Sequence, residues 1–279
     1  KSITNTNGKI FTLTKDKNND GKIDIEDLEW DYLEGDGDFN SDEITKLRDV
    51  SDFIITNPPF SMFKEFYNWA TIEGKYFIII SNKNAVTYKD VFPMIMNNQV
   101  WTGKTKWSGG LWFETKHKEN VDKVIDGIDM KNIPAIWLTN IDHGRRHEPI
   151  PLMTKADNLK FNKDLAGKKD YDKYINYDAI DIPKTLAIPN DYKGLMGVPI
   201  SFLDRFCPEQ FEIVGTSDNA MIDDVYKLTE SLPRKFIEDY NSTGKKITKS
   251  SKDPVFYENG KDPKKSYTRI FIRNIDVSK

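Results

Sequence analysis

Cysteine, histidine and long apolar runs are scarce in this sequence. Its 279 residues include one cysteine, Cys207, and three histidines, which excludes an internal disulfide framework and a four-cysteine zinc site. Nothing in the sequence around Cys207 would activate its thiol, so we expect a structural role. No apolar run approaches the ~20 residues of a membrane span, and Lys1 opens neither a signal peptide nor a chain with an initiator methionine. We therefore expect a cytoplasmic protein without a membrane partner, and a chain that is a fragment.

Positive charge is slightly deficient overall, but it is unevenly distributed. The chain has 41 Lys and Arg against 44 Asp and Glu, a net charge of −3. Residues 1–50 carry 7 basic and 13 acidic side chains, whereas residues 234–273 carry 11 basic and 5 acidic ones. Nucleic-acid binding requires a basic face rather than a basic total. A phosphate-facing surface is therefore expected near the C-terminus.

The first third of the chain carries the clearest periodicity. A capping-box pattern that begins at Asn40 predicts a helix over 41–50, and an apolar run predicts a buried strand over 53–56. A helix follows two prolines, a second strand is predicted over 76–80, and a further helix over about 88–96. This order of strand, turn, helix, strand, loop and helix is typical of a doubly wound α/β sheet.

The pattern becomes weaker and more β-like beyond residue 100. Apolar runs predict strands over 111–114, 134–139, 211–214 and 268–273. Two polar stretches, 155–185 and 241–266, are predicted to be long loops. Long loops in compact domains are usually functional or disordered, so we expect contacts with a nucleic acid there.

The motif Asn57-Pro58-Pro59-Phe60 directly follows the first predicted strand. The prolines fix two φ angles and remove two N–H donors, which leaves carbonyl oxygens free at the end of the strand. An exocyclic amine placed there could donate hydrogens to the Asn57 side-chain oxygen and to the Pro58 carbonyl, so that its lone pair is free to attack a sulfonium methyl group. Phe60 offers a flat surface on which an extruded base could stack.

The same four residues have a simpler interpretation. They could form an ordinary strand-to-helix turn with a proline at the start of the helix and a phenylalanine in the core. The combination of asparagine, tandem proline and an aromatic residue immediately after a short apolar strand favours the functional interpretation.

These residues make the sequence similar to amino-methyltransferases with a (Asp/Asn/Ser)-Pro-Pro-(Tyr/Phe/Trp) motif. It resembles most closely the EcoRI-type adenine-specific DNA methyltransferases, over about residues 33–275. The segments that carry the resemblance are 35–43, 56–61, 82–85, 139–143 with 146–148, 197–200 and 208–211.

The resemblance implies a fold and a reaction. The fold would be a Rossmann-like, S-adenosylmethionine-dependent methyltransferase sheet with a C-terminal DNA-recognition region. The reaction would move a methyl group from S-adenosylmethionine to the exocyclic N6 of an adenine flipped out of double-stranded DNA, in a restriction-modification system. A restriction endonuclease of the same system would be a partner in function, not in a physical complex.

The resemblance also assigns roles to parts of the chain. Residues 1–34 would be an N-terminal remnant with a calcium-loop-like hairpin, 35–150 the catalytic domain, and 151–279 strands and long loops for target recognition. The motif Asn57-Pro58-Pro59-Phe60 would be catalytic and hold the target adenine.

Asp38 and Phe39 resemble the acidic-aromatic pair that binds the cofactor adenine in this family, a site that Asn57 would share. Without the resemblance, the pair could equally be an acidic loop that ends in a buried aromatic residue. The family's glycine-containing cofactor loop should precede Asp38, but the 34 residues before Gly35 contain nothing like it. We expect either that an N-terminal segment has been removed or that this chain binds the cofactor poorly.

A second motif, between Asp16 and Asp27, has the spacing of a calcium-binding loop. Oxygen donors occupy positions 1, 3, 5, 9 and 12, and Gly21 occupies position 6. Position 12 is Asp rather than the usual Glu, which resembles dockerin-type loops. The candidate ligand positions for Ca2+ are Asp16, Asn18, Asp20, Lys22, Asp24 and Asp27. The same residues would also suit a hairpin turn rich in Asn, Asp and Gly.

Candidate DNA contacts are spread along the chain. Arg145 and Arg146 could bind phosphates in a planar, bidentate manner, although a solvated basic turn is an equal alternative. Near the C-terminus, lysines interleave with Tyr257 and Tyr267, which offers phosphate charge and stacking surface together. The predicted DNA-binding residues are Asn82, Asn84, Arg145, Arg146, Lys245, Lys246 and Tyr257.

Two alternatives to DNA methylation remain at this stage. A glutamine-side-chain protein methyltransferase would use the same amine chemistry, but the basic and aromatic C-terminal region favours a nucleic-acid substrate. A non-catalytic, calcium-stabilised binding module would fit the loop at 16–27 and the missing cofactor loop.

Overall fold

Residues 7–72 and 74–275 are described by the computed structural model. The chain divides into two units, residues 1–77 and 78–279, and both contain helices and strands. Within the described ranges, no helix is long and apolar enough to cross a membrane. This division does not test the expected assignment of roles to 1–34, 35–150 and 151–279, which remains a prediction.

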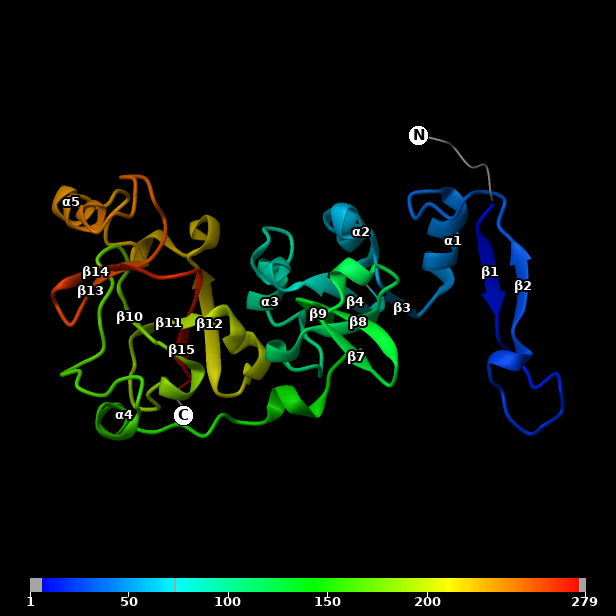
Figure 1. The fold of residues 1–279 in the computed structure, drawn as a ribbon, viewed down its shortest axis with the longest axis horizontal. Coiled ribbons are helices and arrows are strands. Elements are labelled where there is room, and N and C mark those ends of the chain that lie inside the picture. Colours follow the sequence, from blue (N-terminus) through cyan, green and yellow to red (C-terminus); the bar gives the residue numbers. More distant parts are fainter. Residues whose placement is uncertain (1–6, 73, 276–279) are drawn as a thin grey trace. The chain divides into compact units, whose positions relative to one another are not determined.

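The first unit begins with an antiparallel hairpin and continues into a strand between two helices (Figure 1). The helix expected over 41–50 is confirmed. In chain order the elements are β1 (Lys9–Thr12), η1 (Ile25–Asp27), β2 (Glu29–Tyr32), α1 (Asp42–Val50), β3 (Phe53–Thr56), η2 (Phe60–Met62), α2 (Phe63–Ala70) and the start of β4 (Tyr76–Asn82).

The start of α1 differs from the predicted capping box. The N-cap residue is Ser41, whose Oγ accepts the N–H of Ile44 at 3.3 Å. The Glu43 carboxylate instead accepts the backbone N–H groups of Glu34 (2.9 Å) and Gly35 (3.1 Å). The capping box beginning at Asn40 was therefore wrong by one residue, because Glu43 binds the segment that follows β2 and not the helix start.

The strand β3 is less buried than predicted. Phe53 is 55% exposed and Ile55 is 66% exposed, and both project to the same face because side chains alternate along a strand. Tyr76 lies beside β3: its N–H donates to the carbonyl of Asp52 at 3.0 Å, and its ring stacks on Phe53 at 5.3 Å. Described elements of the first unit leave this apolar face open, which corrects the prediction of a buried strand.

The second unit begins with a sheet in which β9 (Ala135–Thr139) is antiparallel to both β4 and β5 (Trp101–Thr102). The sheet is therefore mixed, and the fold is a mixed α/β fold with several sheets. The doubly wound, Rossmann-like arrangement stays a prediction. The helix expected over 88–96 is shorter, α3 (Phe92–Met96). Pro93 explains this start, because proline lacks an N–H and is tolerated only in the first helical turn.

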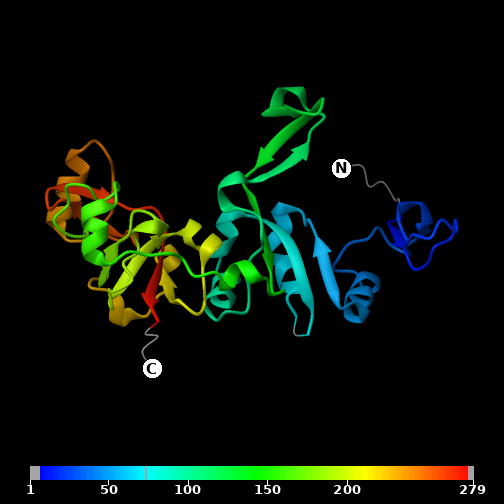
Figure 2. The same ribbon diagram turned by 90° about the horizontal axis from the view of Figure 1, so that it is seen from below.

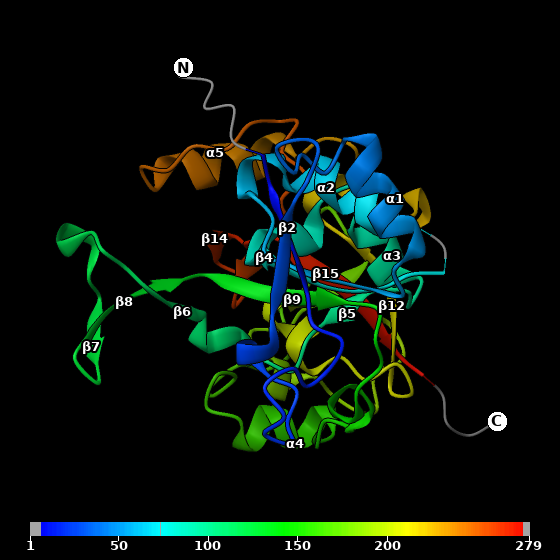
Figure 3. The same cartoon turned by 90° about the vertical axis from the view of Figure 1, so that its right-hand side faces the viewer.

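Three antiparallel strands form a separate sheet that extends from the rest of the second unit (Figure 2 and Figure 3). They are β6 (Leu111–Glu114), β7 (Lys123–Ile125) and β8 (Ile128–Ile133), in the order β6-β8-β7. None of the described residues 111–133 is buried. The predicted strand over 111–114 is confirmed, and the sheet depends on its own strand pairing.

The C-terminal half contains a four-stranded mixed sheet of order β10-β11-β15-β12 and a hairpin of β13 and β14. The strands predicted over 134–139, 211–214 and 268–273 are confirmed to within a few residues. The strands are β10 (Ala179–Asp181), β11 (Leu195–Pro199), β12 (Phe211–Thr216), β13 (Val255–Glu258), β14 (Asp262–Lys265) and β15 (Arg269–Asn274). The α-helices are α4 (Lys155–Phe161) and α5 (Arg234–Ser242).

Short 3-10 helices connect these elements in the second unit. They are η3 (Lys83–Thr87), η4 (Trp107–Gly109), η5 (Lys118–Asn120), η6 (Gly144–His147), η7 (Thr185–Ala187), η8 (Ile200–Arg205), η9 (Asp218–Ala220) and η10 (Asp224–Tyr226).

Both predicted long loops contain regular structure. The stretch 155–185 includes α4 and β10, and its tyrosines Tyr171, Tyr174 and Tyr177 are each 3% exposed. The stretch 241–266 includes the β13–β14 hairpin. The prediction failed because polar residues separate these tyrosines in the sequence, whereas the large rings of Tyr174 and Tyr177 build the core against the C-terminal sheet.

Candidate active site

The Asn-Pro-Pro-Phe motif lies at the C-terminal end of β3, in the first unit. Asn57 is exposed, and its side chain makes no hydrogen bond to any described residue. Pro58 is buried, and its carbonyl accepts no hydrogen bond within the same ranges, whereas the carbonyl of Pro59 accepts the N–H of Met62 at 3.0 Å. Two uncommitted acceptors, the Asn57 side-chain oxygen and the Pro58 carbonyl, thus stand on consecutive residues.

Phe60 begins η2 directly after this turn and is 44% exposed. It is therefore not the core phenylalanine of the simpler interpretation. The core positions are taken by the next residues along α2, where Phe63 and Phe66 are 5% and 7% exposed. The Phe60 ring therefore has an accessible apolar surface, and it follows the two acceptors closely in the sequence.

Asp38 and Phe39 precede α1 and are tied to α2. The Phe39 ring lies edge-on to Phe66 and Trp69, with centroids 5.1 and 5.8 Å apart. One carboxylate oxygen of Asp38 accepts the N–H of Asn40 at 2.9 Å. The other oxygen has no partner among the described residues. This pair therefore offers a hydrogen-bond acceptor and a half-buried ring, the two features that an adenine would need.

Asn82 and Asn84 stand at the end of β4, in the second unit. The Asn82 side-chain oxygen accepts the N–H of Asn84 at 2.9 Å and caps η3. Asn84 is exposed. Asn82 thus has a local structural role, while the role of both residues toward DNA remains a prediction.

Arg145 and Arg146 are engaged within the protein. Arg145 pairs with Asp204 at 2.8 Å. Arg146 is 8% exposed, pairs with Asp142 at 3.0 Å and lies 3.7 Å above the ring of Trp101. The sequence suggested a phosphate contact or a solvated turn, and the structure gives Arg146 an interior packing role. A contact with phosphate remains untested for both.

His147 forms a small charged cluster next to these arginines. Its Nδ1 lies 2.6 Å from Glu209, and its Nε2 lies 3.0 Å from Asp142. These carboxylates, Glu209 first, raise the pKa of His147. Hydrogen bonds from Arg146 and His147 lower the pKa of Asp142 to about 2. The cluster connects Asp142, in the segment after β9, to Glu209, in the segment before β12. Its function within this unit is therefore structural.

The C-terminal candidates divide into exposed and engaged residues. Lys245 and Lys246 are exposed and form no ion pair within the described ranges. Tyr257 donates its hydroxyl to Asp239 at 2.6 Å and packs on Phe236. Burial and this carboxylate raise the pKa of Tyr257 to about 12. The lysines are free to meet phosphates, whereas Tyr257 holds the hairpin against α5.

The calcium-like loop is closed by its own backbone. Asp27 is 2% exposed, and its carboxylate accepts three backbone N–H groups of the loop, two of them at 2.7 and 3.0 Å. Asp16 accepts two more. In the part of the chain that the structure describes, no group of three or more His, Cys, Asp or Glu side chains is placed to hold a metal. Calcium binding by this loop remains a prediction.

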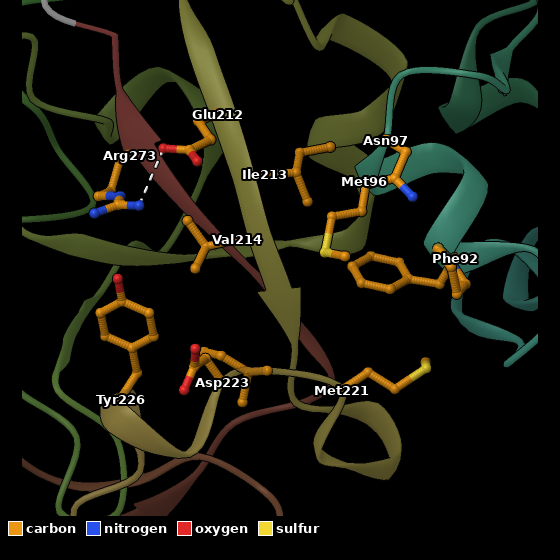
Figure 4. A pocket seen from close by; sticks show the side chains of 12 residues that line it. Phe92, Met96, Asn97, Glu212, Ile213, Val214, Met221, Asp223, Tyr226 and Arg273 are labelled. Atoms are coloured by element: carbon orange, nitrogen blue, oxygen red, sulfur yellow. Dashed lines mark ion pairs between the residues drawn. The ribbon is translucent and has the colours of Figure 1, made fainter.

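A cavity of about 640 Å³ lies between α3 and β12 in the second unit (Figure 4). Phe92, Met96 and Ile213 form its apolar wall, and Arg273 pairs with Glu212 at 3.1 Å on the other side. It shares no residue with the Asn-Pro-Pro-Phe motif, and it was not expected from the sequence.

Comparison with known proteins shows the class of protein to which this chain belongs. The chain matches the family described as adenine-specific methyltransferase EcoRI over residues 3–275. It is a member of the EcoRI family of adenine-specific methyltransferases.

Particular relatives support the assignment. The chain is 38% identical over 209 residues to the type II methyltransferase M.EcoRI of Escherichia coli, covering 71% of this chain and 60% of that protein. It is 35% identical over 211 residues to the type II methyltransferase M.MpnI of Mycoplasma pneumoniae, covering 72% and 62%. The match to M.MgeORF184P of Mycoplasma genitalium is 34% over 194 residues, covering 67% and 59%. The chain thus spans about 60% of the length of these curated relatives, and no solved structure matches it.

Proposed function

We propose that this chain carries the target-base site and the DNA-contacting part of a type II enzyme that methylates adenine at N6 in double-stranded DNA. The observation that carries the proposal is the pair of uncommitted acceptors at Asn57 and Pro58, followed in the sequence by the exposed ring of Phe60. Membership of the family and the names of its relatives agree with this chemistry.

The acceptors act on the exocyclic amine of the target base. One hydrogen of the amine is donated to the Asn57 side-chain oxygen and the other to the Pro58 carbonyl. These bonds favour a pyramidal nitrogen and direct its lone pair toward the methyl donor. Phe60 stacks on the base after the base has left the duplex, an interaction worth roughly 1–3 kcal/mol. No strong general base is required of the chain.

S-adenosylmethionine, when bound, supplies an electrophilic methyl group on a sulfonium centre. Asp38 fits the adenine end of this cofactor because one of its carboxylate oxygens is uncommitted and can accept from an amino group. Phe39 fits the adenine ring, since Phe66 and Trp69 fix its position while the residue remains half-buried. No glycine loop precedes this pair in the described residues, so residues for the remainder of the cofactor are not assigned.

The remaining elements of the proposal concern architecture and context. The mixed sheet of β4, β5 and β9 would be part of a Rossmann-like methyltransferase sheet, and the C-terminal half would recognise the DNA target. Lys245 and Lys246 would contact phosphates from the loop between α5 and β13. Such an enzyme would act in the cytoplasm in a restriction-modification system, with a restriction endonuclease as its partner in function only.

The test compares two substitutions at one position. Asn57→Ala removes the acceptor and should abolish methyl transfer to DNA, while Asn57→Asp retains an acceptor oxygen and should keep part of the activity. Asn120→Ala serves as a control, because Asn120 is also exposed and lies in the separate three-stranded sheet region. Near-normal transfer by Asn57→Ala, with an unchanged circular-dichroism spectrum, would refute the role of Asn57.

A further inference from the structure

Tyr267 is the most exposed of the large apolar and aromatic side chains recorded in the described residues. It is 90% exposed, and it lies in the short link between β14 and β15. Its ring and hydroxyl form no hydrogen bond or ring contact with any described residue. The core of the second unit therefore does not use this ring.

The side chains of residues on both sides of Tyr267 are held by one buried carboxylate. Asp181 Oδ1 accepts the hydroxyl of Ser266 at 3.1 Å and the guanidinium of Arg269 at 3.0 and 3.2 Å. The same oxygen accepts the hydroxyl of Tyr174 at 2.5 Å. Asp181 and Arg269 are 10% and 11% exposed in their side chains. The residue before Tyr267 and the residue two after it are therefore fixed at the same point.

Backbone hydrogen bonds also hold Ser266 and Arg269, and we call these two residues, with Asp181, the platform of Tyr267. The N–H of Ser266 donates to the carbonyl of Pro254 at 2.9 Å. The N–H of Arg269 donates to Ser217 Oγ at 2.9 Å. An exposed tyrosine on a rigid segment loses little conformational freedom when it binds, because the backbone is already ordered and the ring has only two side-chain torsions.

The surroundings of Tyr267 are positively charged. Lys264 and Lys265, directly before Ser266, are 46% and 38% exposed in their side chains, and among the described residues they pair only with the surface carboxylates Glu258 and Asp253. Such surface pairs are weak and can be exchanged for phosphate. Lys252 directly precedes Asp253 and Pro254 in the sequence. These two residues bind the β14–β15 link: Asp253 pairs with Lys265, and the carbonyl of Pro254 accepts the N–H of Ser266. The charge therefore favours a polyanion as the partner.

We propose that Tyr267 stacks on a nucleobase of bound DNA. The face of this base becomes exposed when the DNA double helix is opened. A ring flanked by lysines matches a nucleic acid, because base–aromatic stacking supplies affinity while the lysines neutralise phosphates. This inference rests on the proposed function, since it takes DNA as the ligand. It adds a base-contacting residue in the second unit that is independent of the Asn57 motif.

The test measures binding of the full chain to two fluorescent duplexes of the same sequence. One duplex is fully paired, and the other has a single bulged adenine, so that base faces are exposed without any methyl transfer. Tyr267→Ala should weaken binding to the bulged duplex by about 5- to 100-fold and remove the preference for it over the paired duplex. Tyr267→Trp should restore both, because tryptophan retains the stacking surface.

Two controls separate stacking from charge and from folding. Tyr32→Ala removes another exposed tyrosine ring near a lysine, 58% exposed and 5.9 Å from the Lys9 ammonium, and should not change either affinity. The salt dependence of binding should be unaltered in Tyr267→Ala, whereas Lys245→Ala should make it shallower. Thermal unfolding of Tyr267→Ala should match the parent, since the ring has no contacts.

Each outcome decides between the two proposals. If the parent chain binds DNA and Tyr267→Ala binds both duplexes equally well, the stacking role is wrong while the proposed function stands. If Tyr267→Ala weakens both duplexes alike and Tyr267→Trp does not restore binding, the contact is not a stack and the inference is overturned. If the parent chain binds neither duplex, both the inference and the proposal of DNA as the substrate fail.

Discussion

Asp181→Ala should destabilise the second unit strongly, because Asp181 holds the only charge that neutralises the buried Arg269 in the described structure. The two side chains are 10% and 11% exposed, and Asp181 Oδ1 also accepts from Tyr174 and Ser266. Burial, and then the neighbouring carboxylate, raises the pKa of Tyr174 well above its ordinary value, so its hydroxyl remains a donor at neutral pH.

The magnitude follows from what the substitution leaves behind. Removing one partner of a buried ion pair typically costs about 3–5 kcal/mol, since the remaining charge is neither solvated nor paired. For a domain of this size, roughly 2–4 °C of Tm is lost per kcal/mol, so Tm should fall by about 6–20 °C. Asp253→Ala is the matched control: its ion pair with Lys265 is at the surface and should be worth about 0–1 kcal/mol.

The assay is thermal unfolding followed by circular dichroism, with a double variant as the second control. Asp181→Leu with Arg269→Met replaces the pair by apolar side chains and should recover most of the loss, because no charge is then left buried. If Asp181→Ala unfolds within about 1 kcal/mol of the parent, like Asp253→Ala, the buried pair is not a structural anchor. The rigid platform inferred for Tyr267 would then be wrong as well.

Two further predictions concern packing and pH. Gly197→Ala would place its Cβ 2.5 Å from the Tyr174 hydroxyl oxygen and should destabilise the chain by about 1–3 kcal/mol; an unchanged unfolding midpoint in urea would contradict this. The pKa of His147 is raised from 6.5 by Glu209 and Asp142, so the folded state favours the protonated ring. That stabilisation is full below the unfolded pKa of 6.5 and is lost as the pH rises through the folded pKa. His147→Gln should therefore lower Tm more at about pH 5.5 than at about pH 8.5, and equal losses would show that the ring does not titrate in this way.

Local chemistry made much of the first unit predictable from the sequence. Two prolines after a β-branched run end a strand wherever they occur, which located the turn at Asn57. The helix over 41–50 followed from its apolar spacing, although its cap was placed one residue early because Glu43 binds the N–H groups of Glu34 and Gly35. The exposure of β3 was not predictable, because it depends on which elements cover the strand.

Long-range contacts in the second unit could not be predicted from the sequence. The antiparallel pairing of β9 with β4 joins two segments that are separated by the 52 residues between Asn82 and Ala135. Local periodicity does not indicate the direction of such a pairing. Arg146 was read as a phosphate contact because its burial against Trp101, a residue far away in sequence, cannot be seen from its neighbours. Arg269 offered a signal: an arginine that opens an otherwise apolar strand requires a buried acceptor, which proved to be Asp181.

The central claim is that this chain places an adenine amine against Asn57 and Pro58. The measurement that tests it most directly is transfer of a tritiated methyl group from S-adenosylmethionine to duplex DNA, by the chain and by a version extended at its N-terminus. The DNA is then digested to nucleosides and the labelled product identified by chromatography. The account predicts label in N6-methyladenine from at least the extended form, and none from the same form with Asn57→Ala. Label in no DNA base, or equal label with Asn57→Ala, would contradict it.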